Sequence, residues 1–255
     1  MAELSGPTQV LIVDDDPVMG ELLDALLTVE GYRVTRALSG EEALQVVRAS
    51  DHKPDVILCD IQMPGMRGGE LAHALADART EGALPGATVI LAMSGSAPRP
   101  DEAQFFQGVL RKPFSVPNFA QAVTEARTRS SNTQRTTHPD VEEGSSGRPP
   151  LDDRIFEQLT TKIGAESVRQ LYDMTLEDVR ARLGRIGAAA DRGDEATVRQ
   201  EAHTIKGSCG MVGALELQAL AAATEGGSPI DTYTLANFDS ACKRLERMLS
   251  ERLKA

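Results

Sequence analysis

The sequence predicts an α/β domain built on a parallel sheet, followed by an all-α helical bundle. In the first half of the chain, short apolar runs alternate with segments of helical periodicity. Runs without polar alternation are typical of parallel strands that are buried on both faces. Beyond about residue 150 the strand signal disappears and only helical periodicity remains. We therefore expect a first domain over residues 7–128, a linker rich in Ser, Thr, Gly and Pro over 129–150, and a second domain over 151–255.

Five apolar runs supply the strands of the sheet. The central run, residues 55–60, contains four consecutive apolar residues, ends at Asp60, and is followed by a turn at Pro64 and Gly65. The other four strands are expected at residues 10–13, 32–37, 87–93 and 109–110. Strand and helix alternate five times, which predicts a doubly wound, five-stranded parallel sheet with helices on both faces.

Helix signals follow these strands. Pro17 suits the first turn of a helix, and Gly31 ends that helix. Ser39 and Glu42 form a capping-box pattern for a second helix, which runs to about residue 47. Two further helices are expected at about 69–79 and 117–127.

The second domain is expected to contain helices alone. They are predicted at residues 152–163, 166–190, 194–212, 214–225 and 231–254. Because the connections between them are short, the pattern predicts an antiparallel helical bundle.

The composition excludes several classes of protein. The chain has 27 Lys and Arg against 38 Asp and Glu, and no segment is basic enough to predict nucleic-acid binding. No apolar run approaches the roughly 20 residues that a membrane-spanning helix needs. The three cysteines (Cys59, Cys209 and Cys242) are far apart and odd in number, so they predict neither a metal cluster nor a disulfide framework. We therefore expect a cytoplasmic protein without a nucleic-acid or membrane partner.

Polar side chains gather where the predicted strands end, which is where ligands bind in open α/β sheets. These residues are Asp14, Asp15, Asp16, Asp60, Ser94 and Lys112. Clustered carboxylates repel one another, so their convergence indicates a hard cation such as Mg²⁺, which takes oxygen ligands. A cation beside a free carboxylate, a lysine and a hydroxyl group is the equipment for phosphoryl transfer.

This pattern resembles the receiver domain of two-component response regulators over about residues 7–128. The matching residues are the pair Asp14 and Asp15, Asp60 followed by Met63-Pro64-Gly65, Ser94, and Lys112-Pro113-Phe114. The resemblance implies a flavodoxin-like sheet and a protein that accepts phosphate from an upstream histidine kinase and hydrolyses it slowly.

The resemblance also implies a role for each site residue. Asp60 would be the phosphoacceptor. Asp15 would bind Mg²⁺ directly, Asp14 would act partly through water, and the carbonyl group of Gln62 would be a further ligand. The side chains of Ser94 and Lys112 would contact the phosphoryl group.

Two features depart from this family. Ser94 and Lys112 are 18 positions apart, about four fewer than the resemblance implies, and Pro98 and Pro100 interrupt the segment. Val109 stands where the family usually has an aromatic residue that reports phosphorylation. We therefore expect residues 95–108 to be mobile before phosphorylation, and to become ordered or to change their docking to the second domain afterwards.

A haloacid-dehalogenase-type phosphatase is the alternative for this domain. Asp14-x-Asp16-x-Val18 after a strand fits the nucleophile motif of that family. The family needs a further acidic pair after the lysine, and only Glu125 stands between Lys112 and the linker. It also leaves the motif that follows Asp60 unexplained.

His203 is the candidate reactive residue of the second domain. On a helical wheel it lies with Gly207 and Gly210 opposite an apolar stripe, which consists of Val198, Ala202, Ile205, Cys209 and Val212. Because glycine costs up to about 1 kcal/mol inside a helix, we expect an exposed, smooth patch against which a partner presses. Lys206 is placed to offset the charge of a phosphoryl group on the imidazole. The alternative is a helix break at Gly207.

The motif from His203 to Ser208, with Gly210 and Gly213, resembles the histidine-phosphotransfer (HPt) domain over about residues 150–255. That family is a four-helix bundle with an exposed, phosphorylatable histidine. A kinase dimerisation domain is a near alternative, but nothing after His203 supplies the Asn- and Gly-rich boxes of an ATP-binding domain. The other histidines, His52, His73 and His138, are expected to be solvated.

Together the two resemblances imply a phosphorelay protein. His203 would exchange phosphate with a receiver aspartate, either Asp60 of this chain or that of a separate receiver. The alternative is an interaction module whose receiver regulates the bundle without transfer through His203.

Overall fold

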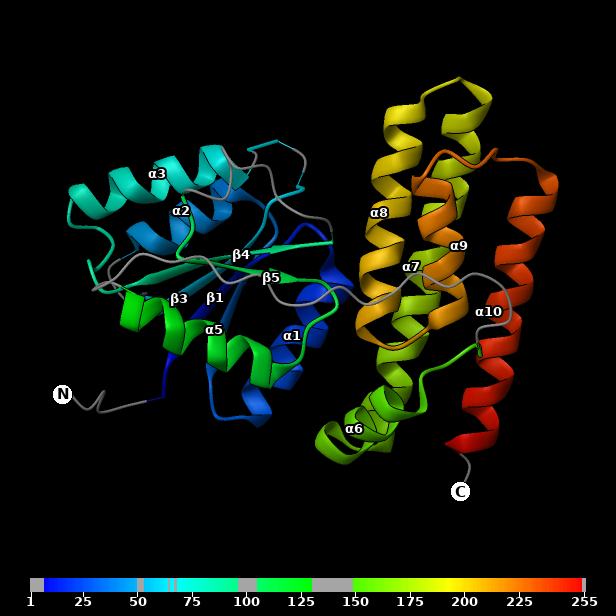
Figure 1. The fold of residues 1–255 in the computed structure, drawn as a ribbon, viewed down its shortest axis with the longest axis horizontal. Helices are drawn as coiled ribbons and strands as arrows, with labels where there is room; N and C mark the ends of the chain where they lie inside the picture. Colours follow the sequence, from blue (N-terminus) through cyan, green and yellow to red (C-terminus); the bar gives the residue numbers. More distant parts are fainter. Residues whose placement is uncertain are drawn as a thin grey trace. The chain divides into compact units, whose positions relative to one another are not determined.

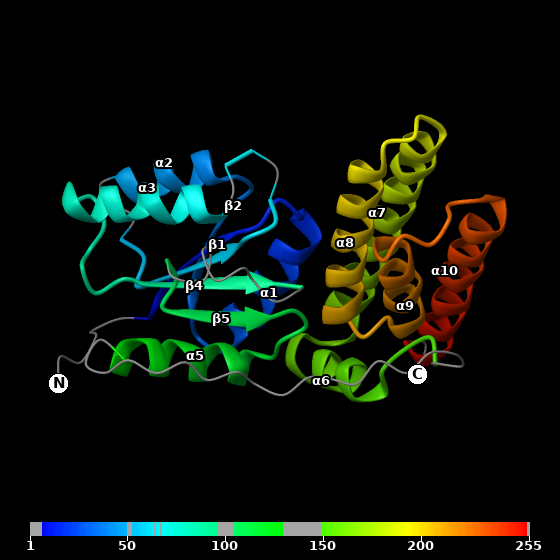
Figure 2. The ribbon, with the colours of Figure 1, turned by 45° about the horizontal axis from the view of Figure 1, so that its top comes forward.

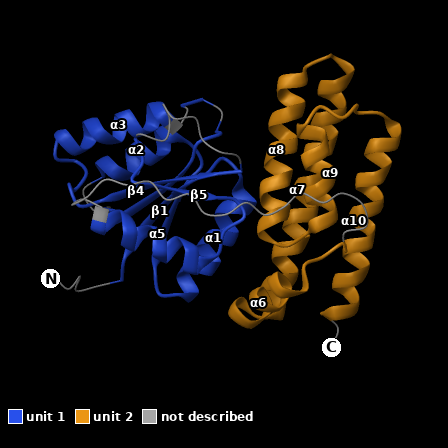
Figure 3. Ribbon diagram, in the orientation of Figure 1, with its two compact units in different colours: residues 1–139 blue, residues 140–255 orange. Residues whose placement is uncertain are grey.

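The computed structural model describes residues 7–49, 53–63, 65–66, 68–95, 105–129 and 149–253. The chain divides into two compact units, residues 1–139 and 140–255 (Figure 3). The predicted linker lies almost entirely outside the described residues, as do His52 and His138. The three domain boundaries predicted from the sequence therefore remain predictions.

The first unit contains a five-stranded parallel sheet, as the sequence predicts. Its strands are β1 (Gln9–Val13), β2 (Arg33–Ala37), β3 (Val56–Asp60), β4 (Val89–Ser94) and β5 (Gly108–Arg111). Their order across the sheet is β2-β1-β3-β4-β5. Each neighbouring pair is parallel, so the carboxyl ends of all five strands lie at one edge.

Helices cover both faces of this sheet. They are α1 (Pro17–Val29), α2 (Gly40–Arg48), α3 (Gly68–Thr80) and α5 (Val116–Arg129). Figures 1 and 2 show α2 and α3 on one face and α1 and α5 on the other. The stretch 96–104, which holds most of the segment expected to change order, lies outside the described residues.

Local capping explains where the first helices begin. Asp16 caps α1 because its Oδ1 accepts a hydrogen bond from the Val18 N–H at 3.0 Å, with Pro17 in the first turn. At α2, Ser39 Oγ accepts from the Glu42 N–H at 3.2 Å. Glu42 Oε2 in turn accepts from the N–H of Leu38 at 2.7 Å. The capping box is confirmed, with the return bond one residue earlier than in the usual motif.

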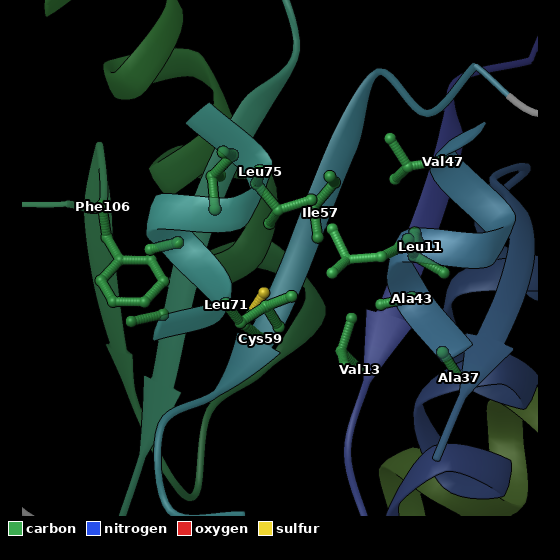
Figure 4. Packing of buried hydrophobic residues seen from close by; sticks show 14 of the residues in the cluster. Leu11, Val13, Ala37, Ala43, Val47, Ile57, Cys59, Leu71, Leu75 and Phe106 are labelled. Atoms are coloured by element: carbon green, nitrogen blue, oxygen red, sulfur yellow. The ribbon is translucent and has the colours of Figure 1, made fainter. Parts of the chain in front are cut away.

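A buried aliphatic core fixes the strands that carry the acidic residues. Figure 4 shows side chains of β1 and β3 packed against those of α2 and α3. The labelled members include Leu11, Val13, Ala43, Val47, Ile57, Cys59, Leu71, Leu75 and Phe106. Burying one Leu or Ile side chain stabilises a fold by about 1.5–3 kcal/mol. This packing holds the ends of β1 and β3 side by side.

The second unit is helical among its described residues, as predicted. Its helices are α6 (Asp153–Ile163), α7 (Ala165–Asp191), α8 (Glu195–Met211), α9 (Leu215–Glu225) and α10 (Thr232–Arg252). Helices α7 to α10 form a bundle, and α6 lies at one end of it (Figure 1). Aspartates cap α6, α8 and α10 through Asp152, Asp194 and Asp231.

The end of α8 is held by hydrogen bonds from two other elements. The hydroxyl group of Tyr172, on α7, donates to the carbonyl oxygen of Val212 at 2.5 Å. The N–H of Asp152, just before α6, donates to the carbonyl oxygen of Gly213 at 2.8 Å. Gly213 has a φ of 73°, and a Cβ there would lie 3.0 Å from the Ile155 Cβ, so the close turn requires glycine.

Among the described residues, no helix combines the length and apolar character needed to cross a membrane.

Candidate functional site

The strand register brings the predicted site residues of the first unit to one edge of the sheet. Val13 pairs with Cys59, so Asp14 follows β1 where Asp60 ends β3. Asp60 pairs with Met93, directly before Ser94 at the end of β4. The N–H of Lys112 donates to the carbonyl oxygen of Ser94 at 2.8 Å, which places the lysine just beyond β5 at the same edge.

Lys112 connects the two buried carboxylates. Its Nζ lies 2.7 Å from Asp60 Oδ2 and 2.9 Å from Asp14 Oδ2. The Lys112 side chain is 6% exposed, and those of Asp14 and Asp60 are 1% and 8% exposed. Burial alone would lower the pKa of Lys112, but the two carboxylates outweigh it and raise this pKa, so the ammonium form is retained.

Three carboxylates form a cluster that can hold a cation. Oxygen atoms of Asp14, Asp15 and Asp60 all lie within 4.8 Å of one another. Burial, with a contribution from the nearby Asp60, raises the pKa of Asp14 to about 6, although Lys112 opposes this shift. An all-oxygen donor set in which carboxylates repel one another fits a hard divalent cation.

The remaining acidic and polar residues around this cluster have separate contacts. The N–H of Gln62 donates to Asp60 Oδ1 at 2.8 Å, and the predicted role of its carbonyl group as a metal ligand stays a prediction. Ser94 is fully buried, and its predicted contact with a phosphoryl group also stays a prediction. Asp16, which the sequence also placed among the polar residues at the strand ends, acts as the α1 cap.

In the second unit, His203 and Lys206 share one carboxylate. His203 Nδ1 lies 2.6 Å from Glu225 Oε1, and Lys206 Nζ lies 2.6 Å from Glu225 Oε2. The exposed fractions of the three side chains are 13%, 22% and 25% for His203, Lys206 and Glu225. Burial would raise the pKa of Glu225, but the hydrogen bonds from His203 and Lys206 outweigh it and lower the pKa to about 2. The carboxylate is therefore ionised.

The sequence did not single out Glu225. It is the last residue of α9, and its contact with α8 depends on how two helices pack, which helical periodicity does not reveal. One signal was available in the sequence. An acidic residue at the negatively polarised end of a helix, directly before Gly226 and Gly227, is unfavourable unless a cation lies nearby.

The alternative of a helix break at Gly207 is excluded, because α8 continues unbroken to Met211. The expectation of an exposed glycine patch on this helix is wrong. Gly207 and Gly210 are buried, and His203 is only partly exposed, so an open glycine patch is not observed. A glycine lies at the level of the backbone, and longer side chains around it shield it from solvent, which a helical wheel does not take into account.

The other described histidine agrees with expectation. His73 is exposed on α3, and its ring packs on Phe105 with 4.1 Å between ring centroids. It lies on α3 of the first unit, whereas the residues of the carboxylate cluster lie at the ends of β1 and β3.

Comparison with known proteins gives two family matches. The response regulator receiver domain matches residues 10–124, and the Hpt domain matches residues 170–254. The polar-differentiation response regulator DivK of Brucella anthropi is 34% identical over 121 residues, which is 46% of this chain and 94% of that protein. DivK of Brucella ovis is 35% identical over 118 residues, 45% of this chain and 91% of that protein. Among solved structures, Vibrio cholerae chemotaxis protein CheY4 matches with 28% identity and a TM-score of 0.42, over 48% of this chain and 99% of that one.

Proposed function

We propose that this chain carries phosphate on Asp60 and on His203. It belongs to the response regulator family, and with a receiver domain and an Hpt domain it is a two-component phosphorelay protein. The receiver match decides against a haloacid-dehalogenase-type phosphatase, and the Hpt match against a kinase dimerisation domain. The single observation that carries the assignment of Asp60 is its contact with the buried ammonium group of Lys112 inside the carboxylate cluster.

At the first site, the chemistry is transfer of a phosphoryl group to a carboxylate. An oxygen lone pair of Asp60 attacks phosphorus, and the P–N bond to the donor imidazole breaks with its electron pair returning to that ring nitrogen, which leaves a neutral imidazole that keeps the proton on its other nitrogen. Lys112 already lies 2.7 Å from Asp60 Oδ2, so its charge faces the incoming phosphoryl oxygens. The hydroxyl group of Ser94 would donate to another of these oxygens.

The residues of this site fit Mg²⁺. Asp14, Asp15 and Asp60 would hold the ion, with the carbonyl group of Gln62 as a further ligand. A bound Mg²⁺ supplies positive charge that neutralises phosphoryl oxygens. Because Asp14 and Asp60 both contact Lys112, the carboxylates that hold the lysine are the ones that would hold the ion.

At the second site, His203 accepts the phosphoryl group from an aspartyl phosphate. Glu225 occupies Nδ1, so the Nε2 lone pair attacks phosphorus while the P–O bond to the aspartate breaks and leaves a carboxylate. Lys206 lies one helical turn from His203, where it can offset the new charge. An upstream histidine kinase would be the phosphate donor for Asp60. The exchange partner of His203 would be Asp60 of this chain or the aspartate of a separate receiver.

A second function deserves a test because His203 is only 13% exposed. In this alternative the bundle binds partners under control of the receiver, without transfer through His203. A cytoplasmic location, expected from the cysteine content, is compatible with both functions and remains a prediction.

The test is radiolabelled phosphotransfer in the full chain with acetyl phosphate as donor. Asp60→Asn is expected to abolish the acid-stable aspartyl label, and His203→Gln the acid-labile, alkali-stable histidyl label. His73→Gln is the matched control because this exposed histidine lies outside both sites, and it is expected to label as wild type. Normal labelling of Asp60→Asn would exclude Asp60 as the acceptor, and a histidyl label that survives His203→Gln would leave the bundle as a binding module.

A further inference from the structure

We propose that Gly40 and Met66 are positioning residues for Asp60: their contact holds the segment after β3, whose backbone orients the Asp60 carboxylate, against the first turn of α2. The inference rests on the proposed function of Asp60 and adds two residues outside the carboxylate cluster that keep this acceptor in place. Its basis is that Met66 fills the space beside Gly40 that a larger residue would need.

The Asp60 carboxylate is held through both of its oxygens. Lys112 Nζ lies 2.7 Å from Oδ2, and the N–H of Gln62 donates to Oδ1 at 2.8 Å. Lys112 lies just beyond β5, whereas Gln62 belongs to the segment that directly follows Asp60. A shift of that segment would therefore turn the carboxylate, and small misplacements of a reacting group lower reaction rates strongly.

The segment after Asp60 is anchored to the sheet at its near end. The N–H of Ile61 donates to the carbonyl oxygen of Met93 on β4 at 3.3 Å, and Met63 is buried in the core. Gly65 then turns the chain with a φ of 80°, which favours glycine. The turn leads to Met66, which packs partly buried against the same core. Met66 is thus the outer anchor of the segment.

Met66 comes so close to α2 that it requires a glycine there. A Cβ on Gly40 would lie 3.0 Å from both the Cβ and the Sδ of Met66, whereas non-bonded carbon atoms prefer about 3.5–4.0 Å. The Sδ could turn away, but the Cβ is fixed to the backbone, so the segment itself would have to move. Helix propensity has the opposite preference, because alanine favours a helix more than glycine does. The glycine therefore serves the contact with Met66.

Helix α2 is a firm support for this contact. Its side chains Ala43 and Val47 pack into the core of the first unit (Figure 4). Gly40 itself is buried in the first turn, directly after the capping residue Ser39. The support reaches Asp60 only through the backbone of the intervening segment, which makes its role one of positioning.

The experiment uses the full chain with Gly40→Ala and Met66→Gly, singly and together. Met66→Gly removes every atom of Met66 that a Cβ at position 40 would meet. One readout is the dissociation constant of Mg²⁺ from calorimetric titration. The other is the amide proton chemical shift of Gln62 in the metal-free chain, which reports its hydrogen bond to Asp60. Gly69→Ala is the matched control, because Gly69 lies on α3 and a Cβ there meets nothing within 4 Å.

The expected result for Gly40→Ala is a shifted Gln62 amide and a dissociation constant roughly tenfold higher, the usual size of an effect on groups that orient metal ligands. Met66→Gly alone should also raise the constant, because the segment loses its outer anchor. In the Met66→Gly chain, Gly40→Ala should add no further loss, since the contact that couples the two positions is gone. Gly69→Ala should match the wild type in both readouts.

Three outcomes would each overturn the inference. They are an unchanged Gln62 amide in Gly40→Ala, the same loss from Gly40→Ala with and without Met66, and wild-type affinity in Met66→Gly. Failure of the proposed function would look different: the wild-type chain itself would take no aspartyl label from acetyl phosphate. The Gln62 amide of the metal-free chain would still decide whether Gly40 and Met66 position Asp60.

Discussion

The ammonium group of Lys112 lies 2.7 Å from Asp60 Oδ2, and both side chains are almost completely buried. The cation is therefore in place before any phosphoryl group arrives. We predict that Lys112→Ala lowers the rate of labelling by acetyl phosphate by roughly 10²–10³, the usual effect of removing one preorganised group that stabilises developing charge. Initial rates of ³²P incorporation at saturating Mg²⁺ measure this.

Lys53→Ala provides the control for Lys112. Lys53 belongs to the same unit, but its Nζ donates to the carbonyl oxygen of Ala83 at the surface. The control is expected to label at the wild-type rate. If Lys112→Ala also labels at that rate, the contact with Asp60 has no part in the chemistry.

Mg²⁺ binding is predicted to weaken below about pH 6. The pKa of Asp14 is raised to about 6, mainly by burial, so the folded protein takes up a proton there as the pH falls. A proton on Asp14 competes with the cation, and the dissociation constant is expected to rise by about tenfold per pH unit below that point. Calorimetric titration with Mg²⁺ between pH 5 and 8 checks this.

Asp14→Asn separates this effect from a general loss of affinity. The variant should bind Mg²⁺ more weakly at pH 8 and show a much flatter dependence around pH 6. An unchanged slope in the variant would assign the proton to another group of the cluster.

The sheet and its carboxylate cluster could be predicted because they depend on short stretches of sequence. A strand buried on both faces is an apolar run, and residues 55–60 show one ending at Asp60. In a parallel sheet the ends of all strands meet, so Asp14, Asp60 and Lys112 had to converge once the strands were identified.

The second site shows where such reasoning stops. His203 and Lys206 lie on one helix and could be placed by periodicity, but Glu225 comes from another helix. Its position depends on the rotation and offset of α9 against α8, which no local pattern encodes. The burial of Gly207 and Gly210 was missed for a related reason, because a helical wheel describes one helix without its surroundings.

Transfer between the two sites of one chain is predicted from the linker. About 22 residues over 129–150, if flexible, have a root-mean-square span of roughly 25 Å. This gives His203 an effective concentration near the millimolar range at Asp60 of the same chain. Label on His203 should therefore form at a rate independent of protein concentration in the wild type.

Mixing Asp60→Asn chains with His203→Gln chains isolates transfer between molecules. The mixture is expected to be slower at micromolar concentration and linear in concentration. A wild-type rate that is also linear in concentration and equal to that of the mixture would show that transfer runs between separate chains.

The last prediction concerns the stability of the helix that carries His203. The hydroxyl group of Tyr172 donates to the carbonyl oxygen of Val212 at 2.5 Å, and both residues are buried. Tyr172→Phe leaves this carbonyl without its donor in an apolar surrounding, which is expected to cost about 1–3 kcal/mol. Hydrogen exchange of the α8 amides measures the loss as a lower free energy of opening.

Tyr233→Phe, at a residue that is 73% exposed, is the control and should stay within about 0.5 kcal/mol of wild type. Equal protection of α8 in both variants would mean that packing, and not this hydrogen bond, holds the end of the helix.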